Sequence, residues 1–123
     1  MNNLKVVIAE DSLVMRDLLE RTLSKVEGLT IVGTAFDGDE AIRMVSELNP
    51  DVLISDILMP GQNGLEVLRE VRKRDPTIRV IMFTGEPSLA LRRICLESGA
   101  SYYLEKSKLK ELVEICKRVL RSR

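Results

Sequence analysis

Short apolar stretches of strand length alternate with longer amphipathic segments along the whole chain. The apolar stretches are rich in Val and Ile and mostly lack polar alternation, as expected of strands that are covered on both faces. They comprise residues 5–9, 30–35, 52–55, 80–84 and 101–104. Five strand–helix units in strict alternation predict an α/β fold, in which a parallel sheet lies between layers of helices.

Helix start signals agree with this division. Ser12 is suited to cap the first helix, and Asp37 followed by Glu40 three residues later is typical of a capping box for the second. Asn63 opens the third helix, and Pro87 fits the first turn of the fourth. The fifth helix is predicted from about residue 108 onward.

Composition limits the classes of function. A chain of 123 residues without a linker or repeat predicts one domain, residues 1–123, and no second domain. Nineteen basic and nineteen acidic residues cancel, so bulk charge favours neither nucleic acid nor a membrane as a partner. There is no histidine, and the two cysteines lie 21 positions apart, which argues against a zinc site and against a disulfide scaffold. No signal peptide or membrane span is predicted, so we expect a cytoplasmic protein.

Polar side chains follow the predicted strands at their carboxyl ends. Asp56 ends the third apolar stretch, Glu10 and Asp11 follow the first, Thr84 ends the fourth, and Lys106 follows the fifth. Because the carboxyl ends of parallel strands meet at one edge of a sheet, we expect these side chains to lie together. The sequence therefore places a candidate site at that edge.

The chemistry of this set points to phosphoryl transfer. Carboxylate oxygens without a nearby His or Cys favour Mg²⁺, although acids at positions 10 and 11 would also suit the amino end of the first helix. An aspartate such as Asp56 can accept a phosphoryl group as an acyl phosphate. Lys106 would then neutralise the oxygens of the transferring group, and Thr84 would donate a hydrogen bond to them.

Four motifs, residues 7–12, 55–64, 83–85 and 99–106, resemble in order and spacing those of the response-regulator receiver domain, the phosphoacceptor half of a two-component system. The resemblance covers essentially the whole chain. It implies a flavodoxin-like, doubly wound fold with strand order 2-1-3-4-5 and five helices in a three-layer sandwich. It also implies that a histidine kinase or phosphotransfer protein phosphorylates Asp56, and that Glu10, Asp11, Asp56 and the backbone carbonyl of Leu58 hold Mg²⁺.

The resemblance further implies a switch. Tyr103 matches the aromatic switch position, three residues before the lysine, and would swing inward when Thr84 is drawn toward the phosphoryl group. The output would be a protein-binding surface on the fourth helix, fifth strand and fifth helix, with a phosphorylation-dependent homodimer left open. Leu58 and Glu86 occupy the two positions that tune the lifetime of the phosphoryl group in the family. Leucine cannot orient water by hydrogen bonding, whereas Glu86 would either orient water or lie in solvent, and both outcomes stay open. We expect slow hydrolysis.

Other functions use the same fold. A Mg²⁺-dependent aspartyl phosphatase would need a second acid two residues after the nucleophile, where this chain has Leu58. A flavin-binding module would need a phosphate-binding loop after the first strand, where Glu10 and Asp11 would repel it. We therefore expect no enzyme acting on a separate substrate. A receiver-fold scaffold that is never phosphorylated stays open.

Overall fold

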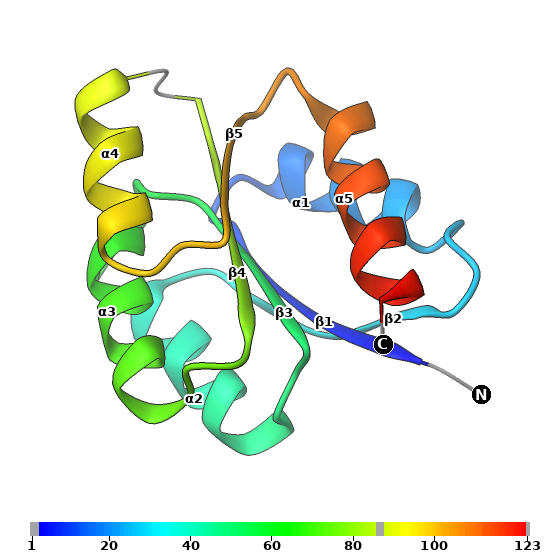
Figure 1. Ribbon diagram of the computed structural model, residues 1–123, viewed down its shortest axis with the longest axis horizontal. Helices are drawn as coiled ribbons and strands as arrows, with labels where there is room; N and C mark the ends of the chain where they lie inside the picture. Colours follow the sequence, from blue (N-terminus) through cyan, green and yellow to red (C-terminus); the bar gives the residue numbers. More distant parts are fainter. Residues whose placement is uncertain (1–2, 86–87, 123) are drawn as a thin grey trace.

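The computed structural model describes residues 3–85 and 88–122, and in these ranges five strands alternate with five helices (Figure 1). The elements are β1 (Leu4–Ala9), α1 (Leu13–Leu23), β2 (Leu29–Ala35), α2 (Gly38–Leu48), β3 (Val52–Ser55), α3 (Gly64–Arg74), β4 (Arg79–Thr84), α4 (Leu89–Glu97), β5 (Tyr102–Glu105) and α5 (Leu109–Arg121). All five predicted strands are present, each within one residue of the predicted bounds.

The strands form one parallel sheet in the order β2-β1-β3-β4-β5. The predicted flavodoxin-like topology is therefore confirmed. Ala9 pairs with Ser55 where β1 and β3 end, and Thr84 pairs with Glu105 where β4 and β5 end. This register brings the residues that follow β1, β3 and β5 to the same edge of the sheet.

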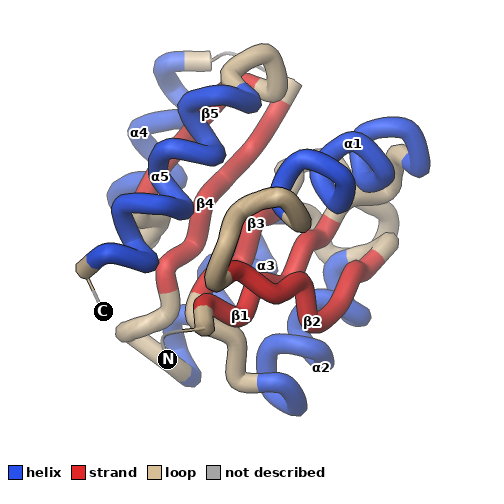
Figure 2. Tube along the Cα trace, turned by 90° about the vertical axis from the view of Figure 1, so that its right-hand side faces the viewer, coloured by secondary structure: helices blue, strands red, loops and turns tan. Residues whose placement is uncertain are grey.

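Two separate apolar clusters cover the two faces of the sheet. Helices α1 and α5 lie on one face, and α2, α3 and α4 lie on the other (Figures 1 and 2). Side chains alternate between the clusters along each strand, so that Val6 and Ile8 belong to the first cluster and Val7 and Ala9 to the second. The central strands β1, β3 and β4 are almost wholly buried, which explains their continuous apolar sequences.

Two helices start as predicted. The Ser12 hydroxyl accepts a hydrogen bond from the Met15 amide at 3.3 Å and so caps α1. At α3, Asn63 and Glu66 accept hydrogen bonds from each other's backbone amides, which completes a capping box there. Pro87, predicted to lie in the first turn of α4, lies outside the described residues; Ser88 caps that helix.

The capping box predicted for α2 is only half right. Asp37 does accept a hydrogen bond from the Glu40 amide at 2.8 Å. The Glu40 carboxylate, however, accepts from the amide of Phe36, one residue before the cap, at 2.9 Å. Because that carboxylate already has the Phe36 amide as its partner, the reciprocal bond to Asp37 is not made.

Both cysteines are free and buried, as the sequence indicated. Burial raises the pKa of the Cys116 thiol to about 11, which makes it unreactive at neutral pH. Across residues 3–85 and 88–122, none of the helices combines the length and the apolar character needed to cross a membrane.

Gly64 permits the close contact between the start of α3 and the end of β3. A Cβ atom at this position would lie 2.0 Å from the Asp56 carbonyl oxygen, and that oxygen belongs to backbone that cannot easily move. Gly64→Ala should therefore lower the free energy of unfolding by about 2 kcal/mol or more, as measured by urea denaturation.

Gly85→Ala is the matched control, because the nearest atom to a Cβ there is the flexible Lys106 Cδ at 4.0 Å. It should change the free energy of unfolding by less than about 1 kcal/mol. Equal losses in the two variants would contradict the steric explanation for Gly64.

Candidate functional site

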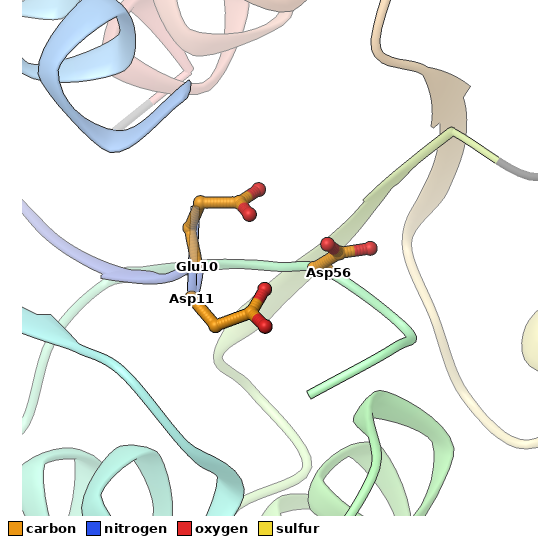
Figure 3. A group of neighbouring side chains, drawn as sticks. All are labelled: Glu10, Asp11 and Asp56. Atoms are coloured by element: carbon orange, nitrogen blue, oxygen red, sulfur yellow. The ribbon is translucent and has the colours of Figure 1, made fainter. Parts of the chain in front are cut away.

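Three carboxylates gather at the carboxyl edge of the sheet (Figure 3). Glu10 and Asp11 follow β1, and Asp56 follows β3. The Asp56 amide donates to the Ala9 carbonyl at 3.0 Å, so that the β1–β3 hydrogen bonding continues one residue beyond the strands. One carboxylate oxygen from each residue lies within 4.8 Å of the others. Glu10 and Asp56 are buried, whereas Asp11 is exposed to solvent.

Lys106 joins two of these acids. Its Nζ lies 2.7 Å from Asp56 Oδ2 and 2.9 Å from Glu10 Oε1. The Lys106 amide donates to the Thr84 carbonyl at 2.8 Å. This bond extends the β4–β5 hydrogen bonding past the end of β5 and fixes the position of the Lys106 backbone. The sequence brought these residues to one edge, and the structure shows that they are in direct contact.

Backbone hydrogen bonds orient both buried carboxylates. Asp56 Oδ1 accepts from the Ile57 amide at 2.7 Å, while its other oxygen accepts from Lys106. Glu10 Oε2 accepts from the Ser12 amide at 3.1 Å. Each buried carboxylate thus has one backbone donor and one shared ammonium donor, and both are held in a defined orientation.

Burial and the ion pairs together shift the pKa values of Glu10 and Lys106. Burial raises the pKa of Glu10 above its ordinary value, and the hydrogen bonds from Lys106 and the Ser12 amide offset only part of this effect. Burial alone would lower the pKa of Lys106, but its hydrogen bonds to Asp56 and Glu10 outweigh burial and raise it. Lys106 is therefore positively charged throughout the neutral range.

Thr84 and Tyr103 lie on neighbouring strands and face the same side of the sheet. Thr84 is fully buried at the end of β4. Tyr103 pairs with Met82 on β4, and both pack in the cluster covered by α2, α3 and α4. Because residues two apart on a strand share a face, Thr84 points to the same side as Met82. Tyr102 packs in the opposite cluster.

Two further predicted positions are Leu58, which the structure describes, and Glu86, which it does not. Leu58 has a side chain that is 61% exposed, in the loop between β3 and α3. Glu86 lies outside the described residues. One buried group was missed by the sequence reasoning: the Ser55 hydroxyl donates to the Asp56 carbonyl at 2.8 Å. A lone hydroxyl at the end of an otherwise apolar strand was the available signal.

Glu10→Gln tests the cause of the raised Glu10 pKa. A folded-state pKa above the unfolded value means that ionisation of Glu10 opposes folding. Stability is therefore lost as pH rises from the ordinary value of 4.5 through the raised pKa. Without added metal, Glu10→Gln should raise the free energy of unfolding by about 1 kcal/mol once Glu10 is ionised in the wild type. The difference should vanish in acid.

The measurement is urea denaturation at several pH values in buffer treated with a chelator. Glu114→Gln is the control, because Glu114 is exposed and its ion pair with Lys117 spans 3.9 Å. A gain that is independent of pH, or equal in both variants, would contradict the assignment.

Comparisons with known proteins identify the family of the chain. The family model of the response regulator receiver domain matches residues 6–117. The response regulator GacA of Pseudomonas aeruginosa is 32% identical over 117 residues, which make up 94% of this chain and 55% of that protein. The protein-glutamate methylesterase/protein-glutamine glutaminase 5 of Myxococcus xanthus is 41% identical over 99 residues, or 79% of this chain and 28% of that enzyme.

A solved structure is similar over nearly the whole chain. The two-component response regulator of the LuxR family from Aurantimonas sp. superposes with a TM-score of 0.91 at 30% identity, and the match covers 99% of this chain and 88% of that one. The present chain spans about half the length of GacA and a smaller part of the methylesterase. By its motifs, fold and relatives, the chain belongs to the response regulator receiver domain family.

Proposed function

We propose that this receiver domain is a phosphorylation switch in which Asp56 accepts a phosphoryl group from a histidine kinase or phosphotransfer protein. The observation that supports this most directly is the ammonium group of Lys106, which lies within hydrogen-bond distance of both Asp56 and Glu10. An acceptor carboxylate beside a fixed cation is suited to receive a group that carries negative charge.

The transfer is a displacement at phosphorus. An Asp56 carboxylate oxygen forms a bond to phosphorus, and the bond from phosphorus to the donor breaks, with its electron pair leaving on the donor atom. Lys106 then pairs with an oxygen of the phosphoryl group in place of the carboxylate. The Thr84 hydroxyl, at the end of the neighbouring strand, donates to another phosphoryl oxygen.

The acidic cluster fits a magnesium ion. Three carboxylates supply hard oxygen ligands from residues 10, 11 and 56, and the single ammonium of Lys106 balances only one of their charges. Glu10, Asp11, Asp56 and the backbone carbonyl of Leu58 would hold the ion. When bound, Mg²⁺ would neutralise negative charge on the cluster and on the phosphoryl oxygens.

Thr84 and Tyr103 would carry the effect of phosphorylation to the protein-binding surface. When the Thr84 hydroxyl moves toward the phosphoryl group it leaves space on the face of the sheet where Tyr103 lies, and the ring moves inward. Tyr103 lines a groove of about 320 Å³ between α4, β5 and α5, together with Leu89, Arg92 and Glu111. A downstream protein, or a second copy of the domain, would read the altered groove. Nothing in the balanced charge favours direct binding to nucleic acid.

Phosphorylation of Asp56 is tested by the intact mass of the protein after treatment with acetyl phosphate. The wild type should gain one phosphoryl group in the presence of Mg²⁺ and none when a chelator is present, because charge on the carboxylates must be neutralised. Asp56→Asn should gain none, whereas Asp17→Asn, which removes an exposed acid paired with Arg21, should behave as the wild type. An unmodified wild type would favour the scaffold alternative, and modification of Asp56→Asn would point to another acceptor.

Inward movement of Tyr103 is tested by nitration of the two tyrosines before and after phosphorylation. Nitration of Tyr103 should fall severalfold on phosphorylation, since its ring loses contact with solvent, while nitration of Tyr102 should not change. Tyr102 is an internal control because it packs on the opposite face of the sheet. Thr84→Ala should abolish the change at Tyr103. A parallel fall at both rings would argue for a general tightening of the fold instead.

A further inference from the structure

The loop between β3 and α3 begins at Asp56 and contains Leu58, and its first part is held by α3. The Gly64 amide donates to the Ile57 carbonyl at 2.7 Å. The absence of a side chain at Gly64 also lets the start of α3 press against the Asp56 carbonyl. The Ile57 side chain is 5% exposed and packs in the apolar cluster. These contacts therefore fix the positions of Asp56 and Ile57.

The middle of the same loop is held by the first turn of α2. The Gly38 amide donates to the Pro60 carbonyl at 3.4 Å, and Asp39 Oδ1 accepts from Gln62 Nε2 at 3.1 Å. Gly38 is buried, and a Cβ atom there would lie 2.0 Å from the Gln62 carbonyl oxygen. The two backbones approach this closely only because residue 38 is glycine.

Leu58 lies between these two attachments, and its own side chain is little buried. Its side chain is 61% exposed, so burial does not fix its orientation. The direction of its carbonyl therefore depends on Ile57 on one side and on residues 59–62 on the other, where Met59 packs against the apolar cluster and Pro60 and Gln62 contact α2. Loosening the second attachment would release the Leu58 carbonyl while leaving the three carboxylates in place.

We propose that Gly38 and Asp39 position the loop so that the Leu58 carbonyl faces the carboxylate cluster, a role that rests on the proposed Mg²⁺ ligation above. Neither residue touches the ion; both act through Pro60 and Gln62. A carbonyl group that is held in place before the ion binds loses less conformational entropy when it coordinates the ion. The contacts of Gly38 and Asp39 therefore raise the affinity for Mg²⁺.

A purely structural role for the contact makes a different prediction. If the α2–loop contact served stability alone, breaking it would lower the free energy of unfolding and leave Mg²⁺ binding by the folded molecules unchanged. Mg²⁺ affinity and the free energy of unfolding must therefore both be measured in each variant.

The first test is Gly38→Ala, with Mg²⁺ binding followed by titration calorimetry. The Cβ must displace the Gln62 backbone, so the Mg²⁺ dissociation constant should rise about tenfold or more. The Mg²⁺ concentration that half-saturates phosphorylation by acetyl phosphate should rise equally, with the maximal rate retained. Gly33→Ala is the control: its Cβ would meet the flexible Met44 side chain at 3.0 Å, away from the loop, and its Mg²⁺ dissociation constant should stay within about twofold.

A milder set of variants guards against misfolding of Gly38→Ala. Gln62→Ala and Asp39→Ala each remove the same side-chain hydrogen bond and should each raise the Mg²⁺ dissociation constant about threefold, with no further rise in the double variant. Asp39→Asn keeps an oxygen that accepts from Gln62 and should retain the wild-type constant. Hydrogen exchange at residues 57–62 should accelerate in the two alanine variants but not in Asp39→Asn.

The possible outcomes separate this inference from the proposed function. Wild-type Mg²⁺ affinity in both Gly38→Ala and Gln62→Ala would overturn the positioning role and leave phosphorylation of Asp56 standing. If Asp39→Asn weakened binding as much as Asp39→Ala, the charge of Asp39 would be the cause and positioning by its hydrogen bond would be overturned. A wild type that neither binds Mg²⁺ nor takes up a phosphoryl group would overturn both proposals.

Discussion

The Lys106 ammonium is the charge on which the arrangement of the sheet edge depends. Two buried carboxylates, Glu10 and Asp56, share it at 2.9 and 2.7 Å. Taking an ion out of water costs several kcal/mol unless an opposite charge and hydrogen bonds compensate for it. One ammonium cannot balance two buried acids and an exposed third, so the site retains negative charge. Burial raises the pKa of Glu10, and the hydrogen bonds from Lys106 and the Ser12 amide offset only part of this effect.

The sheet sustains this imbalance because its backbone hydrogen bonding continues into the site. Asp56 donates to Ala9 and Lys106 donates to Thr84, each one residue beyond the end of a strand. Asp56 and Lys106 are thus extensions of the strands rather than members of independent loops. The two apolar clusters on either side of the sheet stabilise the fold, and this stability offsets the repulsion among the acids.

The sequence predicted the central strands well because each is buried on both faces, and such strands have continuous apolar sequences. It predicted that Glu10, Asp56 and Lys106 lie together because each directly follows a strand of the sheet. The capping boxes show where local patterns fail: Asp37 with Glu40 and Asn63 with Glu66 have the same spacing, yet only the second closes. The competing amide of Phe36 decides the first.

Contacts between distant segments were beyond local patterns. The sequence predicted that Lys106 lies near Asp56 but did not predict that it contacts Glu10. Gly38 reads as an ordinary first residue of a helix, since the backbone that it admits belongs to Gln62, far along the chain. A glycine that allows two backbone segments to approach closely has the same local sequence as a glycine at a helix start. The two cases are distinguished only when the position of the second segment is known.

The order in which the chain leaves the ribosome gives the position of Lys106 a further meaning. Asp56 is synthesised 50 residues before Lys106, and in that interval its carboxylate exists without its ammonium partner. Because β5 must dock beside β4 before Lys106 reaches Asp56 and Glu10, the site is completed only by the last strand of the sheet. A molecule that lacks β5 therefore cannot bring the Lys106 ammonium to Asp56 and Glu10, even where β1, β3 and β4 have formed.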